Sequence, residues 1–150
     1  MIEIELTGVE EFKSNARRLR GKLAKLGDDA AKACADKTVE WLRNSILTRS
    51  LNLQPLSALY AARKGIDNPI LVVTRDYIDS MMVRRSPEAN GWAVDLATDE
   101  LRSLAQWLEF GTRTMPPRPH FRPAADYAMT QIAPEVGRVT LMRIAEELAK

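Results

Sequence analysis

A long helical repeat of apolar residues near the N-terminus restricts the folds open to this chain. Its apolar positions advance in alternating steps of three and four residues through Val9, Phe12, Ala16, Leu19, Leu23, Leu26, Ala30 and Ala33. This spacing places them on one side of an α-helix, which a less regular pattern continues through Val39, Leu42 and Ile46. A helix of about 40 residues is on the order of 60 Å long, which outreaches a compact domain of this size. The stripe therefore has two interpretations: it packs on a sheet, or it forms a seam with another copy of the chain.

Two glycines interrupt this helical pattern. Gly21 and Gly27 each weaken a helix interior by about 1 kcal/mol relative to alanine. We therefore expect a bend near residues 27–29. Asp28 and Asp29 are interpreted as acids at a helix start, where the helix dipole favours negative charge.

Alternating and apolar segments predict the strands. Residues 2–6 alternate with a period of two and predict a strand, after which Thr7 can cap the long helix. Residues 81–85 and 91–97 are extended in character and predict a hairpin. The intervening segment contains Asn90-Gly91, a pair that accepts positive φ. Together these segments predict a small antiparallel sheet.

An irregular segment separates the long helix from this hairpin. Residues 48–69 contain several proline, glycine and asparagine residues, with a short helix expected at 57–64. Thr74 is placed to cap another short helix before the hairpin. Long irregular connections of this kind are usually functional or mobile.

Two more helices follow the hairpin. Residues 99–110 place their leucines on one face, with Asp99 as the expected cap and Gly111 as the stop. The pattern turns helical again from Ala124, and Pro134 predicts a kink or the start of a second helix. The order of elements predicts an α+β fold, in which a small antiparallel sheet packs against a long N-terminal helix and a C-terminal helix. We expect one domain over residues 1–150 with an extended loop at 111–123.

The composition excludes several classes of function. The chain has 150 residues, 22 basic and 20 acidic side chains, and a net charge of +2, so no strong overall attraction to nucleic acid or anionic lipid is indicated. It has no apolar run of the ~20 residues that span a bilayer, and its acidic N-terminus is unlike a signal peptide. We find no phosphate-binding loop and no nucleophile motif. We therefore expect no enzyme, no cofactor and no membrane partner.

The single cysteine and the single histidine exclude further chemistry. Cys34 alone cannot form an intramolecular disulfide or a cysteine-rich zinc site, and it lies among alanines as a small buried filler. His120 alone cannot form a two-histidine metal site. It has no acid within five residues on either side, so we interpret it as a structural or interface histidine. We expect neither a catalytic nor a metal site.

The loop at 111–123 is the most unusual stretch of the sequence. Residues 112–123 contain four prolines, three arginines and no acid. Each proline fixes its own φ and biases the preceding residue toward extended geometry, so the backbone is stiff. Guanidinium groups on Arg113, Arg118 and Arg122 can then pair with carboxylates or phosphates of a partner at low ordering cost. The alternative is a solvated linker between two helices.

This segment also resembles a known family. The matching residues are Glu109, Phe110, Gly111, Thr112, Met115, Pro116, Arg118, Pro119, Phe121, Arg122, Pro123 and Ala124. Their pattern resembles the signature of tail-completion or neck proteins of long-tailed double-stranded DNA phages, including the minor tail component family and virion-morphogenesis proteins. Family members more often have an aliphatic residue or Phe where this chain has His120.

The resemblance implies a structural virion protein. Such a protein forms a ring of about six copies at the head-proximal end of the tail, around the DNA channel. Its expected partners are itself, neighbouring neck proteins (tail terminator, head-closure or adaptor proteins), the tail tube, and genomic DNA that passes without sequence recognition. It is expected in the host cytoplasm during assembly and then in the virion. The expected assembly interface comprises Glu109, Phe110, Gly111, Thr112, Arg113, Met115, Pro116, Arg118, Pro119, Phe121 and Arg122.

Two alternatives remain open at the level of sequence. A tail terminator or a head-closure ring protein of the same neck would have similar features. A DNA-binding module belongs to a different class and would use Arg84, Arg85, Arg113, Arg118 and Arg122. Salt-dependent binding to free duplex DNA would distinguish that module, because neutralised phosphates release counterions.

Overall fold

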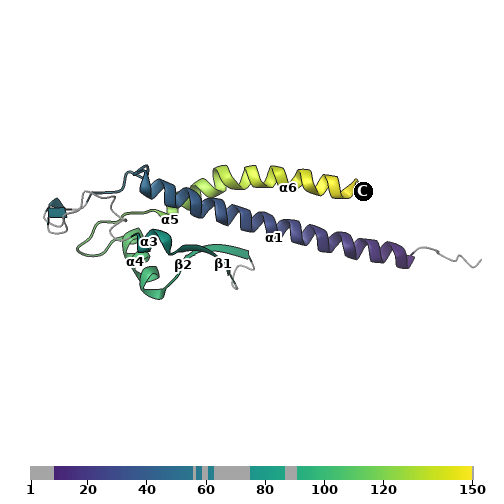
Figure 1. Ribbon diagram of the computed structural model, residues 1–150, viewed down its shortest axis with the longest axis horizontal. Coiled ribbons are helices and arrows are strands. Elements are labelled where there is room, and N and C mark those ends of the chain that lie inside the picture. The colour runs from purple at the N-terminus through teal and green to yellow at the C-terminus, as the bar shows by residue number, and fades with distance from the viewer. Residues whose placement is uncertain (1–8, 56, 59–60, 63–74, 87–90, 150) are drawn as a thin grey trace, which may run out of the picture.

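The computed structural model describes residues 9–55, 57–58, 61–62, 75–86 and 91–149. Its elements are α1 (Val9–Leu47), α3 (Asp76–Asp79), β1 (Met81–Ser86), β2 (Gly91–Leu96), α4 (Asp99–Phe110), α5 (Phe121–Tyr127), the π-helix η1 (Ala128–Ile132) and α6 (Ala133–Leu148). A long N-terminal helix, a small antiparallel sheet and a C-terminal helix are all present (Figure 1), which confirms the α+β fold class. The expected strand at 2–6, the caps at Thr7 and Thr74, and half of the expected helix at 57–64 lie outside the described residues, while residues 58, 61 and 62 are helical.

Helix α1 is continuous over 39 residues and straight along its length (Figure 1), so the expected bend near residues 27–29 is wrong. Asp28 lies in the interior of α1 rather than at a helix start. The Asp28 carboxylate instead binds the hairpin: it accepts from Arg85 Nη1 and from Trp92 Nε1, both at 3.1 Å. These contacts brace the helix beside the glycine.

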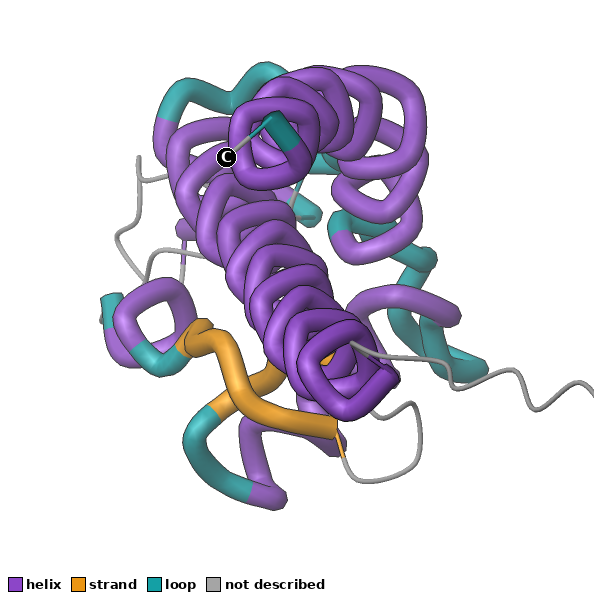
Figure 2. Tube along the Cα trace, turned by 90° about the vertical axis from the view of Figure 1, so that its right-hand side faces the viewer, coloured by secondary structure: helices purple, strands orange, loops and turns teal. Residues whose placement is uncertain are grey.

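Helix α1 lies between the hairpin and α6. Strands β1 and β2 pair antiparallel, with Met81 opposite Leu96 and Ser86 opposite Gly91, which confirms the predicted hairpin. The hairpin packs on α1, and α6 runs along a different side of the same helix (Figures 1 and 2). Ion pairs join the two long helices at both ends of their contact, Lys37 to Glu135 at 2.9 Å and Lys22 to Glu147 at 2.6 Å.

The hydrophobic core lies at the C-terminal end of α1. Apolar side chains of α1 pack there on α3, on both strands, on α4 and on α5. The buried members are Val39, Leu42, Ile46, Tyr77, Ile78, Met81, Leu96, Ala105, Leu108 and Ala124. The first interpretation of the stripe, that it packs on a sheet, therefore holds for its C-terminal continuation. Phe12, in the N-terminal half, remains 74% exposed.

The C-terminal helical run begins earlier than predicted. Helix α5 begins at Phe121 rather than at Ala124. A π-helical turn then leads into α6, whose first turn contains Pro134, and this confirms the predicted second helix start. Pro134 has no N–H to donate, and it stands next to the π-helical turn, where the pattern of backbone hydrogen bonds changes. Tyr127, at the end of α5, stacks on Trp41 of α1 with ring centroids 4.4 Å apart.

Candidate assembly interface

The loop between α4 and α5 has a fixed backbone. Thr98, rather than the predicted Asp99, caps α4, and Gly111 ends it as expected. Gly111 has φ 76°, and a Cβ at this position would lie 2.9 Å from both the Met115 carbonyl oxygen and the Pro117 nitrogen. Only glycine accepts both this positive φ and the lack of space for a Cβ without strain. The next turn is closed by hydrogen bonds between the backbones of Thr112 and Met115, at 2.9 and 3.3 Å.

Glu109 joins the end of α4 to the start of α5. Its carboxylate accepts three backbone N–H groups, from His120 at 2.8 Å and from Phe121 and Arg122 at 3.0 Å. These are first-turn donors of α5, which have no partner inside the helix. Burial would raise the pKa of Glu109, yet the three N–H groups hold it below its ordinary value. The carboxylate thus works as a helix cap supplied from another helix, which explains why α5 begins at Phe121.

His120 is a buried structural residue, as predicted. Its side chain has 0% exposure. Nδ1 lies 3.0 Å from the Arg118 carbonyl oxygen, which can only accept, so Nδ1 carries the proton. Nε2 then accepts from the Tyr77 hydroxyl at 2.5 Å. Burial lowers the pKa of His120 and raises that of Tyr77, so both side chains are neutral at pH 7.

Arg118 is also structural, which corrects the expectation that its guanidinium is presented to a partner. The side chain is only 4% exposed. Nε donates to the Gln54 carbonyl at 2.9 Å and Nη2 to the Pro55 carbonyl at 3.3 Å, while the backbone N–H donates to Leu108 at 2.6 Å. The long cationic side chain of Arg118 points inward, because backbone carbonyl groups there replace water as its hydrogen-bond acceptors. Arg118 therefore ties the loop to the segment after α1.

The eleven predicted interface residues divide into two groups. Glu109, Gly111, Met115, Arg118, Pro119 and Phe121 are buried or partly buried and hold the loop in place. Phe110, Thr112, Arg113, Pro116 and Arg122 are exposed. We name this second group, together with Trp107 of α4, the outer loop face. Phe110 and Trp107 are 70% and 56% exposed. Arg113 and Arg122 form no ion pair within the described part of the chain.

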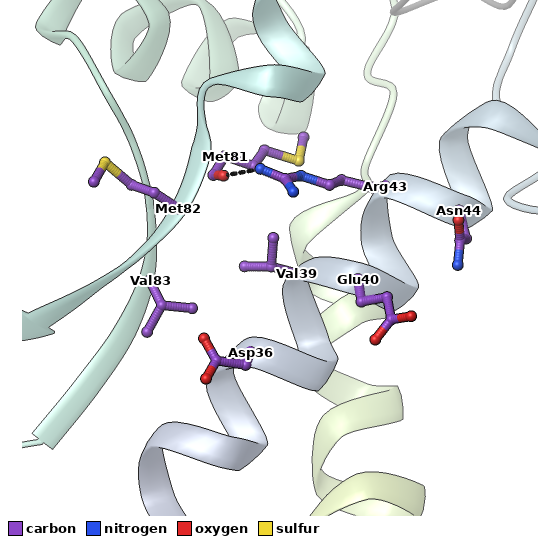
Figure 3. A pocket seen from close by; sticks show the side chains of 8 residues that line it. All are labelled: Asp36, Val39, Glu40, Arg43, Asn44, Met81, Met82 and Val83. Carbon is purple, nitrogen blue, oxygen red and sulfur yellow. Dashed lines mark hydrogen bonds between the residues drawn. The ribbon is translucent and has the colours of Figure 1, made fainter.

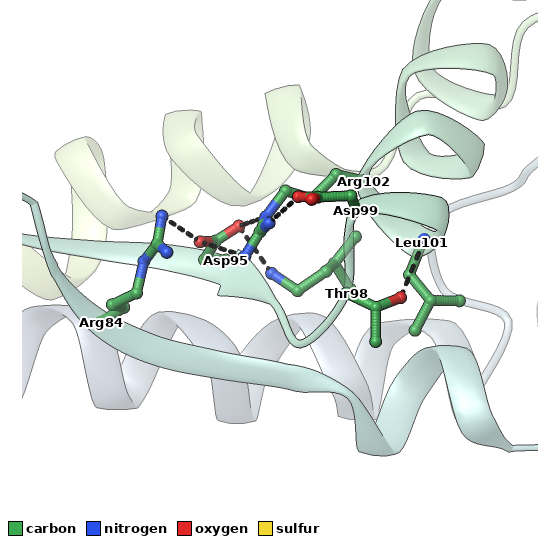
Figure 4. Close-up of polar contacts among 7 residues, drawn as sticks. Arg84, Asp95, Thr98, Asp99, Leu101 and Arg102 are labelled. Carbon is green, nitrogen blue, oxygen red and sulfur yellow. Dashed lines mark hydrogen bonds and ion pairs between the residues drawn. The ribbon is translucent and has the colours of Figure 1, made fainter.

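The arginines of the hairpin form ion pairs with acids of the same chain. Arg84 pairs with Asp95 at 2.7 Å, and Arg102 of α4 binds both oxygens of the same carboxylate, at 2.9 and 3.2 Å (Figure 4). The hydrogen bond from Arg102 is the main cause that lowers the pKa of Asp95. Arg85 pairs with Asp28. With Arg118 buried, the five arginines of the DNA-binding alternative do not form one free surface.

Sequence reasoning missed one apolar surface. Leu141, Met142 and Leu148 of α6 are exposed, and the first two line a hollow together with Pro134, Gly137 and Ala145. The pattern after Ala124 was interpreted only as helical, but residues 141, 145 and 148 repeat at helical spacing and would have indicated a second apolar stripe.

No set of three metal-binding side chains is found among the described residues. Cys34 was expected to be a buried filler but is only partly buried, and this partial burial raises the pKa of its thiol. None of the described helices combines the length and apolar character needed to cross a membrane.

Comparison of the chain with protein-family models, with curated proteins and with solved structures gives no match.

Proposed function

We propose that this chain is a structural subunit of a phage neck, a tail-completion protein that forms a ring at the head-proximal end of the tail. The observation that carries the proposal is the outer loop face. An exposed Phe and Trp of α4 are followed by two exposed arginines without described ion pairs, on a backbone that Glu109, Gly111 and Arg118 fix. The residue pattern that resembles the neck family lies in the same loop.

A fixed loop favours assembly because little ordering is lost on binding. Aromatic and arginine side chains are the types enriched at protein interfaces. Ion pairs across a subunit contact would neutralise Arg113 and Arg122, while Phe110 would lose its contact with water. The partners of this face would be neighbouring copies, other neck proteins or the tail tube. The net charge of +2 suits a conduit through which DNA slides, since a strongly basic lumen would retain the genome.

A head–tail joining assay tests this function. Heads and tails made without the chain are mixed with purified wild type or with Arg113→Ala/Arg122→Ala, and infectious particles are counted. We expect the variant to fold normally and to join far fewer particles, because lost interface charge pairs cost about 2–5 kcal/mol per contact. Gln131→Ala, an exposed polar residue of η1, is the matched control. Normal joining by the double variant would show that the loop is a linker.

A further inference from the structure

The N-terminal part of α1 projects from the body of the molecule. Residues 10–18 are all exposed, and α1 extends beyond the C-terminal end of α6 (Figure 1). The Lys22–Glu147 ion pair marks the level at which α6 ends. We name residues 10–25 the arm.

The arm carries an uncovered apolar stripe. Phe12 is 74% exposed, and Leu19 and Leu23 on the same face are only half-buried. Large apolar side chains in a row on a projecting helix mark an interaction site more often than a solvated surface. The stripe continues the one that packs on α6 and in the core, so the helix is amphipathic over its whole length.

The arm is also the most basic part of the chain. Residues 12–25 contain six of the 22 basic residues and no acid, so the other 16 basic residues face 20 acidic ones elsewhere. Lys13 and Lys22 pair with Glu10 and Glu147. The other four, Arg17, Arg18, Arg20 and Lys25, form no ion pair within the described part of the chain.

A groove between α1 and β1 has the complementary character. It encloses about 350 Å³, with Val39, Met82 and Val83 as apolar lining and Asp36 and Glu40 as acids (Figure 3). Arg43 also lines it and keeps its positive charge, while its guanidinium donates to the backbone carbonyls of Ile78, Asp79 and Met81.

The lining therefore has two carboxylates for one guanidinium, beside the apolar side chains of Met82 and Val83. Asp36 is paired with Lys32 at 3.1 Å, whereas Glu40 forms no ion pair within the described residues. Met82 is exposed at the groove and offers a flexible apolar contact. We name this surface the acidic groove.

The arm cannot reach the acidic groove of its own chain. Both lie on the same uninterrupted helix, and Arg20 and Glu40 are separated by about 30 Å at 1.5 Å per residue. A contact between them must join two molecules, each giving its arm to one neighbour and its groove to the other. Such a head-to-tail contact closes into a ring when the rotation per copy permits.

We propose that the arm of one copy docks in the acidic groove of the next, with its apolar stripe on Met82 and Val83 and its arginines beside Asp36 and Glu40. The partner is a second copy of this chain, so the inference rests on the proposed function only in that copies associate. It goes beyond that function in assigning the two surfaces of the contact.

A charge exchange tests the contact. Sedimentation is measured over a wide concentration range for wild type, for an arm variant (Arg17→Glu/Arg20→Glu), for a groove variant (Asp36→Lys/Glu40→Lys) and for the chain that carries all four changes. We expect each two-residue variant to associate at least about tenfold more weakly than wild type, because like charges then meet. The combined chain, and an equimolar mixture of the two variants, should associate like wild type. Thermal melting confirms that each variant is folded.

Cross-linking provides a second measurement. In a Cys34→Ala background, chains with Arg20→Cys and chains with Glu40→Cys are mixed and oxidised. We expect disulfide-linked dimers between the two variants and none within either variant alone. Lys32→Cys with Arg20→Cys is the control pair.

Several results would overturn the contact. Wild type that stays monomeric at every concentration would do so, as would association that neither charge variant alters. In the latter case copies still associate, so the proposed function stands while the assigned surfaces fail. The arm variant could instead lose a salt-dependent binding to duplex DNA or to anionic vesicles while its self-association stays unchanged. That result would overturn the contact and assign the arm to the other partner.

Discussion

The Tyr77 hydroxyl donates a hydrogen bond to Nε2 of His120 across 2.5 Å. This buried contact joins α3, just before the hairpin, to the loop that precedes α5. It requires a neutral imidazole, because Nδ1–H is already directed at the Arg118 carbonyl. A second proton on the ring would place a charge in the core and remove the acceptor of Tyr77. The junction of the two segments is therefore sensitive to acid.

We expect the free energy of unfolding to fall as the pH is lowered below about 6.5, the ordinary value for histidine. Burial lowers the pKa of His120 in the folded state, so the unfolded chain binds the proton first. The stabilisation is complete above the unfolded pKa and is lost as the pH falls toward the folded one. Urea unfolding at several pH values measures this slope. His120→Phe with Tyr77→Phe should remove the component between pH 7 and 5, and an unchanged slope would contradict the assignment.

Glu109 gives a second pH effect in a lower range. Its folded pKa is below the ordinary 4.5, so its contribution is present above that value and is lost as the pH falls through the folded pKa. At neutral pH we expect Glu109→Gln to cost about 1–2 kcal/mol, because three N–H groups at a helix start lose their anionic acceptor. Urea unfolding measures the loss. Glu146→Gln, an exposed acid of α6, should stay within about 0.5 kcal/mol of wild type.

Arg118 and Arg122 should behave differently although both belong to the same motif. Arg118→Ala removes a buried guanidinium from two carbonyl groups, so we expect a loss of about 2–3 kcal/mol in the free energy of unfolding. Arg118→Lys should recover only part of it, since an ammonium lacks the fork that reaches both carbonyls. Arg122→Ala removes an exposed side chain and should change stability by less than about 0.5 kcal/mol. Equal losses for the two alanine variants would contradict the structural role of Arg118.

Periodicity in the sequence predicted the elements that depend on local order. The extent of α1, the hairpin and α4 all followed from spacing and from glycine positions. The bend at Gly27 was predicted wrongly. The cost of a glycine in the helix interior is outweighed there by the contacts of Asp28 with Arg85 and Trp92, which lie far away in sequence. Such tertiary contacts leave no periodic signal.

At the candidate site, too, contacts between residues far apart in sequence could not be predicted. The stiffness of the loop could be predicted from its prolines, and His120 was expected to be a structural or interface residue. The inward turn of Arg118 could not, because its acceptors are the carbonyls of Gln54 and Pro55, more than 60 residues away. A carbonyl has no sequence signature. The cap by Glu109 was hidden for a related reason, since its N–H partners follow eleven to thirteen residues later rather than within one helical turn.

The purified chain should be monomeric when dilute and associate only weakly. The contacts proposed for assembly are a loop face and a single projecting helix, and the rigid-body entropy lost on association offsets much of the free energy that such small contacts supply. Incorporation next to an existing neck or tail surface would add further contacts and complete the ring. Light scattering at micromolar concentration measures the mass. A stable hexamer in dilute solution would contradict conditional assembly.

Two glycine-to-alanine substitutions should change stability in opposite directions. Gly111→Ala places a Cβ 2.9 Å from two backbone atoms at a positive φ, so we expect a loss of about 1–3 kcal/mol. Gly27→Ala adds a methyl group with no atom within 4 Å, in the interior of a continuous helix. There alanine should raise the free energy of unfolding by about 0.5–1 kcal/mol. Chemical denaturation of both variants measures the pair, and destabilisation by Gly27→Ala would mean that α1 bends at this residue after all.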